Sequence, residues 1–296
     1  MSLDVNGPGG PMPRGVTPVS QLRRLRAELK LMRDAAGQTQ KDVADALEWS
    51  MSKVIRIENG PVGISITDLK ALLFHYKVTD DARVDELLEM ARASKQRAWW
   101  HKYKDFFSPK FLNFIGLEAS AIRIRQFQQM IIPGLLQTRD YATAVVESFG
   151  ESPEKVSRGV EVRLERQKQL LGDGPECYFI LDESVLRRLI GNESIMRDQL
   201  QHLKEIAAKD NVTVQVVPFT AGRHRGLGAS FEIFQLTEQE DDYAMVIELP
   251  YQDKLIEESS EETAEYVAIF AELEKIALSE EDSVKLIDRL LGQLPG

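Results

Sequence analysis

The sequence predicts two domains of different class: an all-α helix-turn-helix domain, then an α+β domain with a small, mostly antiparallel sheet of about four strands. Residues 38–60 have the apolar spacing of two short helices that meet at a tight turn. Beyond residue 176, four segments rich in β-branched and aromatic residues interrupt the helical pattern. We divide the chain into a flexible Gly- and Pro-rich tail (1–17), a helical domain (18–92), an aromatic and basic hinge (93–117) and a C-terminal domain (118–296).

The two short helices have the start signals and the faces of a helix-turn-helix. Thr39 and Asp42 form a capping box for the first helix, and Ser50 caps the second. In the second helix, Val54 and Ile57 point inward, which leaves a polar and flexible face outward. Helices this short need flanking helices to bury their apolar side, and the outward face has the size and chemistry of a major-groove reader. The pattern therefore predicts a DNA-binding motif, the alternative being a helical hairpin within a core.

Flanking helices complete a domain of five helices. The first is predicted from residue 18 to residue 36, and two more begin at the caps Ser65 and Thr79. The first helix carries a basic stripe, Arg23, Arg26, Lys30 and Arg33. We consider Arg23, Arg26 and Lys41 as phosphate contacts, although such a stripe is more often a solvated face.

The pair QTQKDVADAL and SMSKVIRIENG resembles the helix-turn-helix of the XRE, or lambda-repressor-like, family. Ala44 and the run Ile57-Glu58-Asn59-Gly60 match its pattern. The turn of that family usually carries Gly in a left-handed conformation, and Glu48 stands there instead. A non-Gly residue in that conformation costs about 1 kcal/mol, which single positions tolerate.

The resemblance implies which residues meet DNA. Ser50, Met51, Ser52 and Arg56 are expected to face base edges, and Lys53 the backbone or a base. Gln40 is expected to contact a phosphate or to support the reading helix. Because one recognition helix reads only a few base pairs, we expect a homodimer on a palindromic operator, with dimer contacts mainly in the C-terminal domain.

The net charge of −10 is divided unevenly along the chain. Residues 1–104 hold 17 Lys and Arg against 13 Asp and Glu, a net charge of +4, whereas residues 105–296 hold 20 against 34, a net charge of −14. A basic N-terminal domain on an acidic body can hold phosphates on one side only. The acidic helices also suggest a small basic protein as a partner.

The hinge and the helices after it contain mixed signals. Trp99 and Trp100 lie among Lys and Arg, so they are candidates for ligand or partner contact, although an amphipathic hinge is the stronger interpretation. A helix is predicted from Glu118 to Met130 and another from Leu135 to Ser148. A third, from Pro153 to Leu171, carries a charged ladder expected to be solvated: Arg158, Glu161, Arg163, Glu165, Arg166 and Lys168.

The strands of the C-terminal domain are predicted from alternation and β-propensity. They are Cys177–Leu181, Val212–Val217, Phe231–Leu236 and Tyr243–Leu249. Helices are expected between and after them, at 183–190, 194–209, 261–277 and 279–291.

The loop TAGRHRGLG at 220–228 is the one C-terminal segment with the chemistry of a site. Arg223, His224 and Arg225 stand among three glycines and could hold an anionic ligand or a partner, or the loop could be a mobile connection. It precedes a strand, unlike a phosphate-binding loop, and the four histidines lack metal-ligand spacing. We expect no enzyme, no catalytic residue, no metal and no cofactor.

Five blocks of the C-terminal region resemble the large C-terminal domain of actinobacterial XRE-type regulators. They are IIPGLLQTRDYA, VRLERQKQLL, LDESVLRRLIG, NVTVQVVPFTAGRH and IALSEEDSVKLI. The resemblance implies an antitoxin-like regulatory and dimerisation domain that senses a small partner protein. The alternative from the residues is a small-molecule effector pocket formed by the hinge and the sheet.

The remaining composition is that of a soluble protein. Cys177 is the single cysteine, so no intrachain disulfide can form, and a reducing cytoplasm is expected. No apolar run is long enough to span a membrane and no signal peptide is visible. We therefore expect a cytoplasmic protein, nucleoid-associated when bound to DNA.

Overall fold

The computed structural model describes residues 17–59, 63–96, 98–171, 174–238, 242–249 and 252–294. The chain divides into two compact units, Met1–His101 and Lys102–Gly296. Of the expected flexible tail, residues 1–16 lie outside the described residues. Thr17 is described, and it caps the first helix by accepting a hydrogen bond from the Ser20 amide at 3.1 Å.

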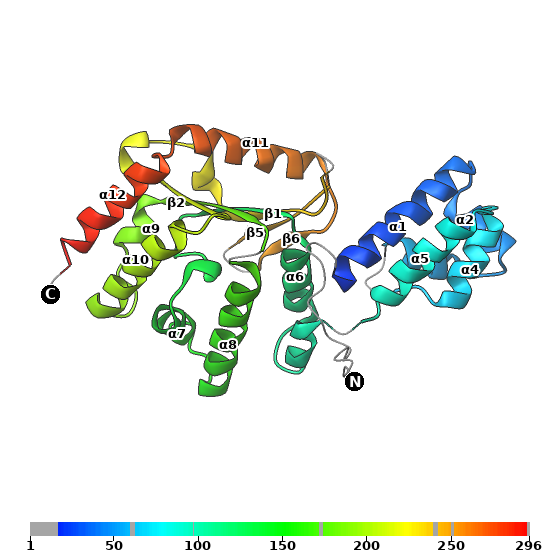
Figure 1. Ribbon diagram of the computed structural model, residues 1–296, viewed down its shortest axis with the longest axis horizontal. Helices are drawn as coiled ribbons and strands as arrows, with labels where there is room; N and C mark the ends of the chain where they lie inside the picture. The colour runs from blue at the N-terminus through cyan, green and yellow to red at the C-terminus, as the bar shows by residue number, and fades with distance from the viewer. Residues whose placement is uncertain are drawn as a thin grey trace, which may run out of the picture. The chain divides into compact units, whose positions relative to one another are not determined.

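The first unit contains five α-helices among its described residues, as predicted (Figure 1). They are α1 (Pro18–Ala35), α2 (Gln40–Ala46), α3 (Met51–Asn59), α4 (Ile66–His75) and α5 (Asp81–Ala93). Each helix contributes apolar side chains to one core, among them Leu25, Val43, Val54, Leu69 and Leu87. The caps Thr39 and Ser65 form as expected, whereas α5 is capped by Asp80 and not by Thr79. Short helices are thus held by a shared core, because none could bury its apolar face alone.

The hinge region and the second unit together contain the remaining elements. The helices are η1 (Trp99–Tyr103), α6 (Pro109–Ser120), η2 (Gly134–Leu136), α7 (Arg139–Glu147), α8 (Pro153–Leu170), α9 (Glu183–Arg187), α10 (Glu193–Ala207), η3 (Phe219–Ala221), η4 (Arg225–Gly228), α11 (Glu261–Ile276) and α12 (Glu280–Leu291). The strands are β1 (Arg123–Gln128), β2 (Glu176–Asp182), β3 (Val212–Val217), β4 (Ser230–Gln235), β5 (Tyr243–Glu248) and β6 (Lys254–Ile256).

The sheet differs from the predicted one in size and in strand direction. It has six strands in the order β3-β2-β1-β4-β5-β6, where about four mostly antiparallel strands were expected. β1, β2 and β3 are parallel to one another, whereas β4 is antiparallel to β1, β5 to β4 and β6 to β5. The sheet is therefore mixed, and β1 lies at its centre between β2 and β4.

Two strands, β1 and β6, were not predicted, for different physical reasons. The segment of β1 was assigned to a helix from Glu118 to Met130, and this was wrong, because α6 ends at Ser120 and Ala121 is already extended. In β1 both faces are largely buried, including Gln126 and Gln128, so no clean alternation marks the strand. β6 has only three residues, too few to show any periodicity.

Two other predicted helices are shorter in the structure. The helix expected from Leu135 to Ser148 is divided into η2 and α7, because Thr138 caps a new helix by accepting from the Tyr141 amide. The helix expected at 183–190 ends at Arg187, and Gly191 adopts a left-handed conformation with φ 70° shortly after it.

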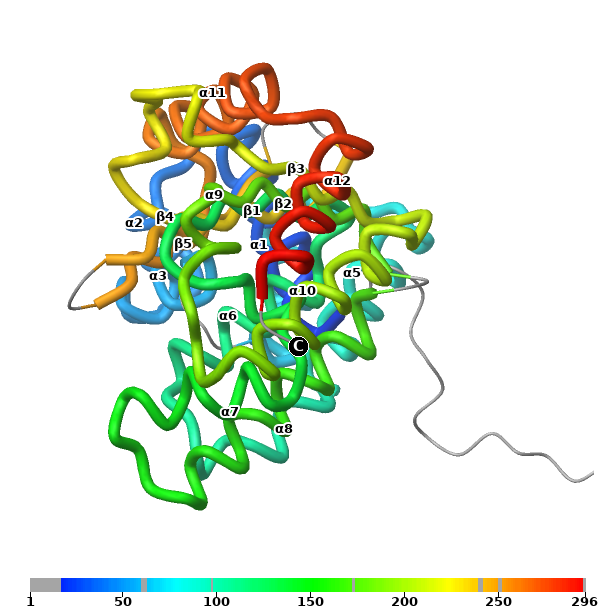
Figure 2. Tube along the Cα trace, turned by 90° about the vertical axis from the view of Figure 1, so that its left-hand side faces the viewer, coloured from blue at the N-terminus to red at the C-terminus, as the bar shows by residue number. Residues whose placement is uncertain are grey.

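The two faces of the sheet are covered differently (Figures 1 and 2). α11 packs on one face through Ile269, Phe270 and Leu273, against an apolar cluster that includes Phe127 and Phe231. Helices α6, α8 and α10 lie on the other side of the sheet. The second face contains the buried ion pair of Arg166 with Glu118 and the buried Glu232.

Buried charge contradicts the expectation of a solvated ladder on α8 at Arg166 and Arg163, whereas Lys168 is exposed as expected. Arg166 is 6% exposed and donates from Nε to Oε2 of Glu118 at 2.7 Å, with a second bond from Nη2 to the other oxygen. Glu232 of β4 is also buried, and burial together with the Glu118 carboxylate raises its pKa well above the usual value. Burial and the neighbouring Arg166 lower the pKa of Arg163 to about 10. The sequence repeat of charges did not show that one side of α8 faces the protein interior.

Candidate nucleic-acid interface

One buried carboxylate joins the first three helices. Glu58 of α3 is 4% exposed and accepts from Arg33 Nε of α1 and from Gln40 Nε2 of α2, each at 2.8 Å. Arg33 also donates to the Gln38 carbonyl at 2.9 Å, and its bond to Glu58 raises its pKa. Charge-assisted bonds of this kind fix the orientation of α3 on the unit. We call Arg33, Gln40 and Glu58 the Glu58 clamp.

The turn between α2 and α3 has the strained geometry that the sequence suggested. Glu48 adopts a left-handed backbone with φ 55°. The Trp49 amide donates to the Ala44 carbonyl at 2.8 Å, which closes the turn. Ser50 then caps α3, because its Oγ accepts from the Lys53 amide at 3.2 Å. A short, hydrogen-bonded turn therefore sets the entry of α3.

α3 divides sharply into an inner and an outer face. Val54, Ile57 and Glu58 are buried. The outer residues Ser50, Met51, Ser52, Ile55, Arg56 and Asn59 are exposed. Four of the residues expected at base edges, Ser50, Met51, Ser52 and Arg56, thus share one surface, which Ile55 extends.

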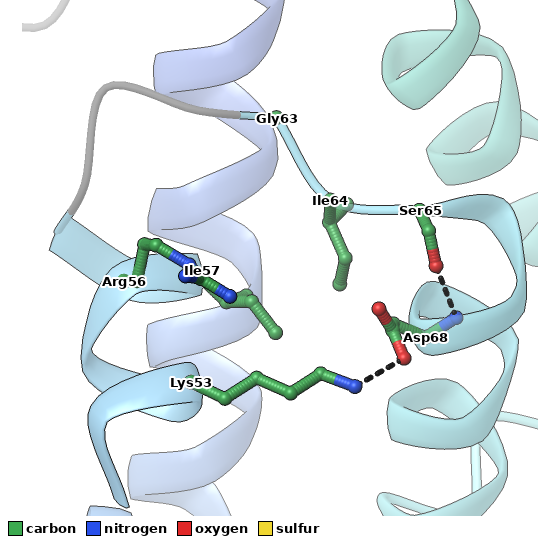
Figure 3. Close-up of a pocket in the computed structure, with 7 residues that line it drawn as sticks. All are labelled: Lys53, Arg56, Ile57, Gly63, Ile64, Ser65 and Asp68. Atoms are coloured by element: carbon green, nitrogen blue, oxygen red, sulfur yellow. Dashed lines mark hydrogen bonds and ion pairs between the residues drawn. The ribbon is translucent and has the colours of Figure 1, made fainter. Parts of the chain in front are cut away.

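Lys53 lies at the margin of this surface, next to a small hollow between α3 and the start of α4 (Figure 3). Its Nζ is 2.6 Å from Asp68 Oδ1 and 3.8 Å from the centre of the Trp49 ring. Burial favours the neutral form of Asp68, but the bonds from Lys53 and Ser65 outweigh it and lower the pKa of Asp68. The hollow, about 230 Å³ in volume, is also lined by Arg56. The two cations Lys53 and Arg56 therefore lie side by side on one flank of α3.

The residues considered as phosphate contacts are placed differently from one another. Lys41 is exposed on α2, next to Gln40 of the clamp. Arg23 and Arg26 of α1 are half-buried and have contacts of their own. Arg33, at the end of the same basic stripe, belongs to the Glu58 clamp. The stripe is thus not a uniform solvated face.

The residues considered for ligand or partner contact lie in both units, the two tryptophans in the first unit and Arg223, His224 and Arg225 in the second. Trp100 is buried and Trp99 half-buried, with their rings edge to face at 5.6 Å. Arg223 is exposed, whereas Arg225 forms ion pairs to two glutamates of α11, Glu265 and Glu272, at 2.7 and 3.1 Å.

His224 is turned into the protein. Its side chain is 6% exposed, its Nε2 lies 3.6 Å from Asp182 Oδ2, and its ring is edge to face with Phe127. Gly226 follows, and a Cβ there would lie 2.7 Å from the Phe127 ring, so only glycine fits this close approach. Gly226 of the 220–228 loop therefore serves packing against Phe127.

Taken together, the five helices, the tight turn and the exposed face of α3 define the first unit as a helix-turn-helix domain, a class that binds DNA through its second helix. A family model described as "Helix-turn-helix domain" matches residues 24–87, and one described as "Domain of unknown function (DUF5753)" matches residues 111–289. The second match covers more than half of the chain, and the protein belongs to this DUF5753 family. Searches of the curated proteins and of the solved structures found no match.

The protein is thus a helix-turn-helix protein with a C-terminal domain of unknown function. In the part of the chain that the structure describes, none of the helices combines the length and apolar character needed to cross a membrane. Two features of the interface were missed by sequence reasoning. The Glu58 clamp could have been suspected from the Ile57-Glu58 motif, and the exposure of Ile55 from the helical spacing that turns Val54 and Ile57 inward.

Proposed function

We propose that the protein is a transcriptional regulator of the XRE type that binds a palindromic operator in double-stranded DNA. The observation that carries the proposal is the exposed outer face of α3, held in place by the Glu58 clamp. The Arg56 guanidinium can donate two hydrogen bonds to one guanine, and the Ser52 hydroxyl can bond to a base edge. Lys41 and Lys53 are assigned to the DNA backbone, where the net charge of +4 on residues 1–104 favours phosphate.

Arg56→Ala should weaken operator binding by about 5- to 150-fold, because a bidentate contact to guanine is worth about 1–3 kcal/mol. The operator is first selected from random duplexes with the full-length protein, and affinities are then measured by fluorescence titration. Arg92→Ala is the matched control, since it removes the same charge from an exposed position on α5 that is paired with Glu89. Equal effects of the two substitutions would contradict the role of Arg56 in base reading.

We further propose that the protein binds as a homodimer. One recognition helix contacts only a few base pairs, whereas two-fold pairing doubles the site and places the half-sites about 34 Å apart. The C-terminal unit is the proposed dimer interface, because it offers the two edges of its sheet, β3 and β6, and amphipathic helices for pairing. Light scattering of the full-length protein should give the mass of a dimer without operator and of two chains per duplex with it. One chain bound per palindrome would contradict the homodimer.

Control through the C-terminal unit by a small partner protein is the third part of the proposal, in line with the antitoxin-like, actinobacterial regulators that the sequence resembles. Its support is a set of exposed apolar residues at one end of the sheet. Met130 follows β1, Leu189 follows β2 and α9, Phe219 follows β3, and Leu227 precedes β4; they are 57%, 53%, 56% and 51% exposed. We call these four residues the carboxyl-end surface.

The segments that carry the carboxyl-end surface are tied to each other. Ser184 Oγ donates to the Gln129 carbonyl at 3.1 Å, and the Gln129 amide donates to Ser230 Oγ at 3.2 Å. The Phe219 amide donates to Glu183 Oε2 at 2.8 Å. Exposed apolar residues gathered at one end of a domain are typical of interaction sites. The charge of −14 on residues 105–296 would steer a basic partner toward this unit.

Phe219→Ser should weaken binding of the partner at least about fivefold and lower its recovery accordingly, since loss of an apolar anchor residue costs more than about 1 kcal/mol. Tagged protein is purified from the native host, and the bound proteins are quantified by intact-mass analysis. Phe149→Ser is the matched control, because Phe149 is 73% exposed beyond the end of α7. Equal recovery with both variants would contradict this surface, and a copurifying small molecule in place of a protein would favour the effector alternative.

A further inference from the structure

The reading face of α3 carries two large apolar side chains that the first unit leaves uncovered. Met51 is 50% exposed and Ile55 is 38% exposed. They stand one helical turn apart, so their side chains are neighbours on the helix surface. The core of the unit is built from other residues of the same helix, Val54 and Ile57. Met51 and Ile55 therefore form an exposed apolar stripe on the helix proposed to enter the major groove.

The stripe occupies one flank of the reading face. Successive residues of an α-helix are rotated by roughly 100° about its axis. Met51 and Ile55 consequently lie next to each other on the flank opposite Lys53. Around the helix from this stripe toward Lys53, Ser52 comes first and Arg56 second. The cationic flank borders the hollow with Asp68, whereas the stripe lies away from it. The reading face thus has an apolar flank and a cationic flank, which meet different chemical groups.

We infer that the apolar stripe reads the 5-methyl group of thymine, an inference that rests on the proposed DNA-binding function. Thymine is the one base of unmodified DNA that presents a methyl group in the major groove, and apolar side chains recognise it by contact. Ile55 is suited to this role because its β-branched side chain has few rotamers, and Met51 adapts its shape beside it. Each operator half-site then contains thymine in addition to the guanine assigned to Arg56.

The test removes the methyl group without changing base pairing. Each thymine of the selected operator is replaced in turn by deoxyuridine, and the affinity of the full-length protein is measured by fluorescence titration. At one or two thymines in each half-site, loss of the methyl should weaken binding about threefold to fivefold. This is the effect expected when the burial of one methyl group is lost. Deoxyuridine in the flanking DNA is the control and should have no effect.

Protein variants then assign the methyl contact to the stripe. At a thymine where deoxyuridine weakens binding, Ile55→Ala should bind the thymine and deoxyuridine operators with equal affinity. Met51→Ala should reduce the difference between the two affinities by a smaller amount. Lys41→Ala serves as the comparison, because it should weaken binding to both duplexes and leave their ratio unchanged. Ile55→Val keeps the β-branched shape and should retain part of the discrimination, and thermal unfolding confirms that each variant is folded.

The outcomes separate the inference from the proposed function. If selection yields no preferred duplex, the proposed function fails and the inference fails with it. If an operator is found but its half-sites contain no thymine, or deoxyuridine is tolerated everywhere, the inference alone is overturned. It is also overturned if the loss caused by deoxyuridine persists unchanged in both the Ile55 and Met51 variants.

Discussion

Replacing Arg166 by Met is expected to destabilise the second unit by about 3–5 kcal/mol, because it leaves the Glu118 carboxylate buried without its counter-charge. Arg158→Met on the same helix is the control. Its pair with Glu161 is roughly 40% exposed on both sides, so the loss should be at most about 1 kcal/mol. Urea unfolding followed by circular dichroism measures both values. A double variant that also carries Glu118→Gln should recover part of the loss, and an additive effect would contradict the pairing.

The same cluster predicts how stability depends on pH. The pKa of Glu232 is raised in the folded state by burial and by the Glu118 carboxylate. Its contribution to stability is therefore full below the unfolded value of about 4.5 and is lost as the pH rises through the raised value. Glu232→Gln keeps the neutral form, so its gain in unfolding free energy over the natural chain should grow from pH 4 upward. A constant difference across pH would show that Glu232 does not change its ionisation on folding.

Replacing Glu58 by Ala is expected to destabilise the first unit by at least about 3 kcal/mol and to abolish operator binding. The substitution removes both bonds of the clamp and leaves Arg33, with a side chain 11% exposed, without the buried partner that raises its pKa. Asp34 still pairs with Arg33, but it is 56% exposed and cannot replace the link between helices. Because the clamp joins α1, α2 and α3, its loss frees the orientation of the reading helix.

Tryptophan fluorescence isolates this effect from the second unit. All three tryptophans, Trp49, Trp99 and Trp100, belong to residues 1–101, so their emission in a urea titration follows the first unit. Glu89→Ala is the control, since Glu89 is a 71% exposed carboxylate paired with Arg92, and its loss should cost less than 1 kcal/mol. If both variants unfold at the same urea concentration, the clamp does not hold the unit together.

The helical unit was predictable because its information is local. Caps, apolar spacing and the turn at Glu48 lie within a few residues of each other, and the structure reproduces the five helices and the left-handed Glu48. The cap of α3 by Ser50 and the inward positions of Val54 and Ile57 follow the same logic. The outward direction of Met51, Ser52 and Arg56 was therefore determined by the sequence before any tertiary contact was known.

The sheet was less predictable because its information is distant along the chain. β1 pairs with β2 about 50 residues later and with β4 about 110 residues later, so its strand character depends on partners that no local window contains. The parallel direction of β2 and β3 likewise depends on the crossover helices and not on the strand residues. Four of the six strand segments were predicted from composition, but the order and direction of the strands were not.

What the sequence alone determined is the helix-turn-helix, the split of charge between the two parts of the chain and the residue types on α3. The tertiary structure decided which charges are buried and which apolar residues are exposed. Glu58 and Arg166 are residue types that usually lie on the surface. They are buried here because the fold brings an ion-pair partner to each, Arg33 to Glu58 and Glu118 to Arg166. Ile55 is a core residue type that remains exposed because Val54 and Ile57 turn the opposite side of α3 toward the core. Burial depends on packing between elements that are distant in the sequence. The pattern within one element does not show which residues of another element will pack against it.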